Sequence, residues 1–126
     1  MINVEKHINQ FRNGALEAWD NAAYLIKGKR IWLGLFALHL AVEKALKAHV
    51  VKETQDVPPF VHNLLKLAEV ANLKLSEKQI NLLADLNPYN IRGRYQEDLG
   101  SPPPMSEVKS LVKRAKEMFE WLIKRL

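Results

Sequence analysis

Two arginines, a glycine and a tyrosine stand together at Arg92-Gly93-Arg94-Tyr95, in a segment bounded by prolines on both sides. Two guanidinium groups separated by a flexible glycine suit the bidentate recognition of a phosphate, and a neighbouring aromatic ring can stack on a base. The segment therefore predicts a binding loop for a nucleotide or its phosphates. The alternative is a solvent-exposed end of a helix, with Tyr95 packed against the helical scaffold.

His62 follows a proline-containing loop and stands where a helix is expected to begin. An imidazole at such a position can serve as a general acid or base near neutral pH, and it can equally cap a helix or anchor a loop. The residue type and place leave both interpretations open. We include His62 with Arg92, Arg94 and Tyr95 among the candidate ligand-binding residues.

His39, Glu43 and Lys47 are spaced four residues apart, so their side chains share one face of a helix. They predict either a polar triplet in a groove or subunit interface, or an internal Glu43–Lys47 pair with His39 hydrogen-bonded to Glu43. The internal pair is the favoured interpretation. His39 and Glu43 could supply two metal ligands, but no further ligands are evident, so we expect no metal site and no cofactor. His7 and His49 are expected on helix surfaces, without a role.

The composition excludes several classes of site. The chain has no cysteine, which rules out disulfides, thiolate nucleophiles and cysteine-ligated metals. Nineteen basic residues against fourteen acidic ones give a net charge of +5, which favours anionic partners such as nucleotides, RNA or an acidic protein surface. The longest apolar run, from Ile31 to Leu38, is too short for a bilayer, which needs about 20 such residues, and the N-terminus lacks a signal pattern. We expect a cytoplasmic protein.

Apolar residues at spacings of three and four predict two long helices in the first half of the chain. The first carries a stripe from Ile8 to Leu25, and Gly28 after it would supply the residue that tolerates positive φ at the helix C-terminus. The second should run from about residue 30 to about residue 53. Its apolar positions go most of the way round, which is typical of a central helix packed on several sides.

Three further helices are predicted after a break at Pro58-Pro59. A short helix ends near Asn72, a fourth begins with a capping box at Ser76 and Gln79, and Ser106 is expected to cap the last one. The core residues expected on these helices are Leu64, Leu65, Leu67, Ala68, Ile80, Leu83, Ala84, Val108, Leu111, Ala115, Met118 and Leu122. The prediction is an all-α, up-and-down bundle of about five helices around a four-helix-bundle-like core, as a single domain over residues 1–126.

Three segments resemble prokaryotic HEPN domains, in the same order. Ala41-Val42-Glu43-Lys44-Ala45-Leu46-Lys47-Ala48 resembles the Ala-x-Glu-Lys-x-x-Lys-Ala core of the family's second helix. Pro59-Phe60-Val61-His62-Asn63-Leu64 resembles the His-polar-Leu opening of the third helix, and Arg92-Gly93-Arg94-Tyr95 is similar to the Arg-Tyr segment after the fourth. The order and spacing of the segments match over nearly the whole chain, and the resemblance is to HEPN proteins of the type paired with minimal nucleotidyltransferases.

The resemblance implies a helical bundle that often dimerises, is encoded beside or fused to a minimal nucleotidyltransferase, and binds nucleotides or nucleic acid. Such pairs form toxin–antitoxin-like or nucleotide-handling systems. Some HEPN branches are ribonucleases or toxins, whose signature is an arginine followed four to six residues later by a histidine. No histidine follows Arg92 here, so that chemistry is not carried over and the chain is expected not to be an enzyme. His39-Leu40 also departs from the family pattern, in which glutamines are frequent at this place.

The leading hypothesis is therefore a HEPN-like homodimer that binds a nucleotide or RNA through Arg92, Arg94 and Tyr95 and acts with a minimal nucleotidyltransferase. The first alternative is a metal-independent ribonuclease or toxin, in which His62 is the general acid or base and Arg92 or Arg94 stabilises the transition state. The second alternative is a dimerisation module without a ligand.

Overall fold

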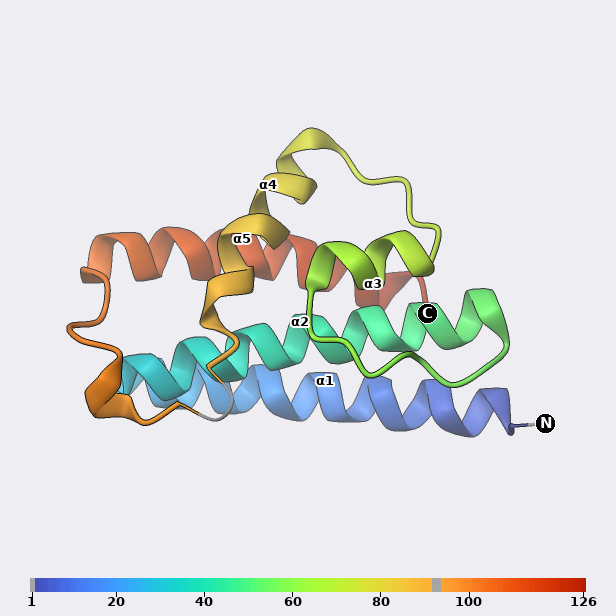
Figure 1. Cartoon of the computed structure of the whole chain (residues 1–126), viewed down its shortest axis with the longest axis horizontal. Helices are drawn as coiled ribbons and strands as arrows, with labels where there is room; N and C mark the ends of the chain where they lie inside the picture. The colour runs from blue at the N-terminus through green and yellow to red at the C-terminus, as the bar shows by residue number, and fades with distance from the viewer. Residues whose placement is uncertain (1, 92–93) are drawn as a thin grey trace.

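The computed structural model describes residues 2–91 and 94–126, and this part of the chain is helical (Figure 1). Its five α-helices and two short 3-10 turns are α1 Val4–Lys27, α2 Ile31–Thr54, α3 Leu64–Val70, α4 Glu77–Leu86, η1 Asn87–Tyr89, η2 Gln96–Asp98 and α5 Met105–Lys124. The predicted all-α bundle is confirmed. Among the residues described, no helix has the length and apolar content needed to cross a membrane.

Helices α1 and α2 form an antiparallel hairpin, and their contact is the most extensive in the fold. A glycine makes the close approach possible: a Cβ atom on Gly34 would lie 2.5 Å from Cγ1 of Ile26. The turn between the helices differs from the prediction. Gly28 has a φ of −81°, and the left-handed residue is Lys29, with a φ of 65°. The expectation that Gly28 supplies the positive φ is wrong by one position, because α1 winds through Lys27 and Gly28 forms its C-cap.

Helix α2 is the central element. It contacts α1, α3, α5 and η1, and it buries residues on every side, including Leu35, Leu38, Leu46 and Val50. Each fully buried leucine or valine of this kind stabilises the fold by roughly 1.5–3 kcal/mol. In Figure 1 the loop after α2 brings the chain back along that helix to the start of α3, and α2, α3 and α5 run in the same direction.

Local signals explain where most helices begin. Ser76 accepts from the Gln79 amide, and the Gln79 side chain accepts from the Ser76 amide, so the predicted capping box is confirmed. The predicted cap at Ser106 is wrong: the N-cap residue of α5 is Pro104, two residues earlier, and no side chain caps the helix.

The core assignments on α4 are only partly right. Leu83 is buried as predicted, but Ala84 is exposed and Ile80 is 44% exposed, while the neighbours Leu82 and Leu86 are buried. The predicted inward face of α4 is rotated about the helix axis relative to the observed one. The difference arises because this short helix contacts both α3 and α5.

Candidate functional site

A carboxylate lies buried at the middle of α2. Glu43 is only 2% exposed, and three basic side chains surround it. The Nζ atom of Lys47 is 3.1 Å from Oε2, Nδ1 of His62 is 3.3 Å from Oε1, and Nδ1 of His39 is 3.6 Å from Oε1. A buried charge is tolerated only when it is paired, and here the pairing comes from two elements of the fold.

Helix α2 supplies His39, Glu43 and Lys47 from one face, as their spacing predicts. The predicted internal pair between Glu43 and Lys47 is present. The sequence did not predict that His39 is completely buried, or that His62 comes to the same carboxylate from a separate segment. The triplet and His62 therefore form one cluster, which we call the Glu43 cluster: His39, Glu43, Lys47 and His62.

Asparagines fix the position of His62. Asn63 caps α3 by accepting from the amides of Leu65 and Lys66. Asn87, at the end of α4, accepts from the Leu64 amide at 2.8 Å and donates to the Asn63 side chain at 3.2 Å. These bonds join the start of α3 to η1, so the loop that carries His62 is held against α2.

The geometry gives His62 a defined orientation. An ionised carboxylate only accepts, so Nδ1 of His62 must carry a proton to donate to Glu43. The other ring nitrogen, Nε2, makes no hydrogen bond to a described residue. The side chain of His62 is 41% exposed and that of Lys47 is 13% exposed. The Glu43 cluster thus presents an oriented imidazole and an ammonium group to solvent, and these groups can bind an anion or move a proton.

The predicted arginine–tyrosine segment is only partly described. Arg92 and Gly93 lie outside the described residues. Arg94 and Tyr95 are exposed, Tyr95 at 73%, and their side chains make no hydrogen bond or ion pair with the described part of the chain. The alternative in which Tyr95 packs against the bundle is wrong. Asn87 ties the start of η1 to Asn63, next to His62. The described residues that flank the segment then contact the N-terminal end of α2, where Tyr89 packs against Trp32 and the Trp32 indole donates to the Gly100 carbonyl. Trp32 is about three helical turns from Glu43.

His49 was expected on a helix surface and is instead 5% exposed. Its Nε2 donates to the carbonyl of Leu122 at 2.8 Å, which joins α2 to the end of α5. Burial lowers the pKa of His49 more than this hydrogen bond raises it, and the charges of Lys52 and Arg125 lower it further. The all-round apolar pattern of α2 was the signal that could have placed His49 inside.

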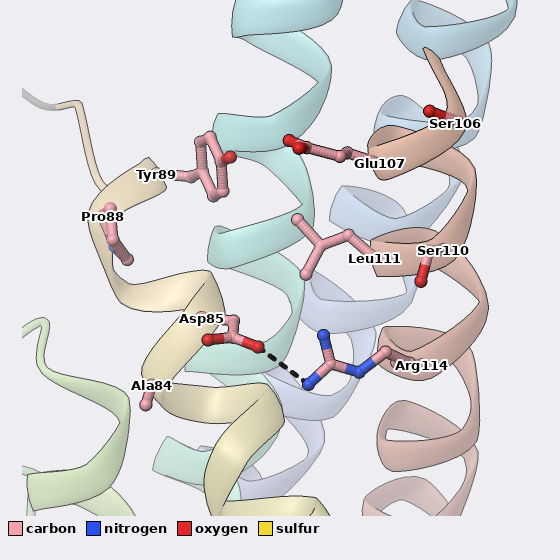
Figure 2. Close-up of a pocket in the computed structure, with 9 residues that line it drawn as sticks. All are labelled: Ala84, Asp85, Pro88, Tyr89, Ser106, Glu107, Ser110, Leu111 and Arg114. Atoms are coloured by element: carbon pink, nitrogen blue, oxygen red, sulfur yellow. Dashed lines mark hydrogen bonds and ion pairs between the residues drawn. The ribbon is translucent and has the colours of Figure 1, made fainter. Parts of the chain in front are cut away.

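Apart from the Glu43 cluster, a polar pocket of about 530 Å³ lies between the α4–η1 segment and α5 (Figure 2). Arg114 donates to Asp85 at 2.9 Å, and the Tyr89 ring stands across the pocket from Glu107. Burial, followed by the charges of Glu107 and Asp85, raises the pKa of Tyr89, so its hydroxyl stays protonated and can donate. Sequence reasoning did not find this pocket, because its residues come from two separate segments, the α4–η1 segment and α5. No group of three or more potential metal ligands occurs in the described ranges.

The fold and the Glu43 cluster define a class: an all-α bundle whose central helix carries a buried carboxylate paired with basic side chains. The profile of the HEPN domain matches residues 8–126, and the chain therefore belongs to the HEPN domain family. Its fold is similar to that of TT1696 from Thermus thermophilus, known from a crystal structure, with a TM-score of 0.75 and 19% identity. That alignment covers 94% of this chain and 98% of TT1696. No curated protein matches the chain.

Proposed function

We propose that this HEPN-domain protein is a nucleotide- or nucleic-acid-binding module whose ligand-binding residues are Lys47, His62, Arg92, Arg94 and Tyr95. One observation carries the proposal: Glu43 holds His62 and Lys47 on the same carboxylate, and both side chains reach solvent. An ordered imidazole and an ammonium group suit a phosphate, and the arginines of the segment before α5 would add guanidinium groups to the same ligand.

We expect the solvent-accessible groups to bind different parts of the ligand. Lys47 has donors left after its contact with Glu43, and the exposed Arg94 guanidinium has no competing partner among the described residues. The exposed ring of Tyr95 offers a face for a base, and such stacking contributes about 1–3 kcal/mol per base. The net charge of +5 adds a favourable long-range attraction for an anion.

Calorimetry tests the site. Nucleoside mono-, di- and triphosphates and a short single-stranded RNA are titrated into the protein, into a double variant Arg92→Ala, Arg94→Ala, and into His62→Ala. A matched double variant, Arg12→Ala, Arg125→Ala, removes the same charge elsewhere. We expect one ligand class to bind, the site variants to weaken it at least about tenfold, which is 1.4 kcal/mol, and the control to leave it unchanged. Equal affinity in all four proteins would remove these residues from the site.

A ribonuclease is the second candidate, because the Glu43–His62 pair resembles the arrangement in which a carboxylate orients a catalytic imidazole. In this case Nε2 of His62 would exchange the proton and Arg92 or Arg94 would stabilise the charge that develops on the phosphate. Labelled RNA cleaved without added metal by the native protein, and not by His62→Gln, would favour the enzyme. RNA left intact, at concentrations where a control nuclease cleaves it, would exclude it.

The partner proposal is a homodimer that acts with a separately encoded minimal nucleotidyltransferase, as in a toxin–antitoxin-like or nucleotide-handling pair. Support comes from membership of the HEPN family and from the basic charge of the chain. Light scattering of the protein alone should give twice the mass of 14.5 kDa, and co-expression with a nucleotidyltransferase encoded beside it should give a co-purifying complex. A dimer that binds neither a nucleotide nor a nucleotidyltransferase would favour the alternative in which the protein is a dimerisation module without a ligand.

A further inference from the structure

A mostly apolar groove lies between α1 and α5, separate from the Glu43 cluster. Its volume is about 380 Å³, within the range of ligand pockets, roughly 300–1,000 Å³. The apolar residues that line it include Trp19, Ala22, Ile26, Leu38, Met105 and Val112. The Trp19 ring stacks on Phe119 with a 4.7 Å separation between centroids, which fixes one wall.

The polar residues of this groove are all basic. Lys27 and Lys29 at the end of α1, and Lys109 on α5, line it and are exposed. None of the three forms an ion pair with a described residue, although other lysines of the chain do. An apolar groove with three unneutralised ammonium groups is electrostatically suited to an anion with an apolar body.

The turn after α1 positions one of these lysines at the groove. Lys29 has a φ of 65°, a conformation that crowds a Cβ atom, while the glycine immediately before it has an ordinary negative φ. The turn is held by Lys29 N donating to the Ile26 carbonyl at 3.0 Å and by Arg30 N donating to the Leu25 carbonyl at 2.8 Å. These two bonds form an ordinary helix C-terminal motif, and Gln55 and Asn72 have the same left-handed conformation after α2 and α3. The motif therefore sets the position of Lys29 and is not itself evidence of a ligand.

We propose that the groove binds a single-chain amphiphile with an anionic head, such as a medium-chain fatty acid. The apolar chain lies along Trp19, Ile26 and Val112, and the head group is bound by Lys27, Lys29 and Lys109. A second copy of this chain fits the groove less well, because it would bring a molecule with a net charge of +5 against three lysines.

Binding is tested with dodecanoate, below the concentration at which it forms micelles, by calorimetry on the full chain. Dodecanol has the same chain without the charge, dodecyl phosphate has a different anionic head, and acetate has the charge without the chain. We expect dodecanoate to bind at least about tenfold more tightly than dodecanol, and acetate to give no signal. Tighter binding of dodecyl phosphate would identify the head as a phosphate. Absence of binding by both anionic amphiphiles would overturn the proposal.

Variants locate the site. Ala23 lines the groove but is exposed, so Ala23→Trp fills the groove without changing the core. It should abolish dodecanoate binding with an unchanged circular dichroism spectrum. Replacing the three groove lysines with glutamine should weaken dodecanoate at least tenfold and leave dodecanol unchanged. The matched control replaces three exposed lysines outside the groove, Lys74, Lys113 and Lys124.

Two results would contradict the site. Equal loss of binding in the groove and control lysine variants would show that net charge alone attracts the amphiphile. A native dimer that binds no dodecanoate and becomes monomeric on Ala23→Trp would show that a second copy covers the groove. Either result overturns the assignment of an amphiphile to this groove.

Discussion

Replacing Glu43 with alanine should destabilise the protein strongly, because it removes the one carboxylate that Lys47 and His62 share. Breaking a buried ion pair by removing one partner typically lowers the free energy of unfolding by 3–5 kcal/mol. Lys47 is 13% exposed and His62 is 41% exposed, so both can regain some hydration in the variant. We therefore expect a loss at the lower end, about 3 kcal/mol.

The expected change is large enough to measure easily. For a chain of 126 residues, 1 kcal/mol corresponds to a shift of about 3–5 °C in the melting temperature, so Glu43→Ala should melt about 10 °C lower. Urea unfolding followed by circular dichroism gives the free energy directly, and an unchanged dependence on urea would show that the folded state is otherwise intact.

Glu69→Ala is the matched control. Glu69 is also on a helix and pairs with Lys66, at 3.8 Å, but its side chain is 75% exposed. Exposed pairs contribute about 0–1 kcal/mol, so this variant should unfold almost as the native protein does. A loss below about 1 kcal/mol in Glu43→Ala, indistinguishable from the control, would refute the role of Glu43 as a buried organising charge.

Three further variants test the fold. Gly34→Ala should lower the free energy of unfolding by about 1–3 kcal/mol in urea titrations, because its Cβ would meet Ile26 at 2.5 Å, and a rise in stability would contradict the close helix contact. His49 has a lowered pKa in the folded state, so its contribution is present above the unfolded pKa of 6.5 and is lost as the pH falls through the lower folded value. The native protein should therefore lose more stability between pH 7 and pH 5 than His49→Gln does, and parallel losses would be inconsistent with a neutral His49 bonded to Leu122. Ser76→Ala should lower the melting temperature by the equivalent of about 1 kcal/mol, and an unchanged temperature would show that the capping box adds nothing.

Local patterns predict most of the fold. Apolar spacing places the long helices within a few residues of their observed ends, and the serine and glutamine of the capping box give the start of α4 directly. The errors occur where tertiary contacts decide. The turn after α1 has its positive φ at Lys29, although Gly28 is the residue that would adopt it most easily. Ile80 was predicted to be buried but faces outward, on a helix that two other helices contact.

The candidate site was predictable in its parts but not in its assembly. Helical spacing alone aligns His39, Glu43 and Lys47. Their meeting with His62 depends on a loop with two prolines and on hydrogen bonds from Asn87, 24 residues away from Asn63. No local sequence pattern predicts such a contact. His62 and the triplet on α2 were therefore predicted as two separate candidate sites.

The most direct test of the proposed binding site is a nuclear magnetic resonance titration of the isotopically labelled protein with the nucleotide or RNA that gives the strongest calorimetric signal. Glu43 orients the His62 imidazole and the Lys47 ammonium group, and Arg94 and Tyr95 are exposed on the segment before α5. We predict that the largest shift changes fall on Lys47, His62, Arg94 and Tyr95 and saturate together. Changes confined to the lysines of α5, or none at saturating ligand, would contradict the assignment of this cluster as a nucleotide site.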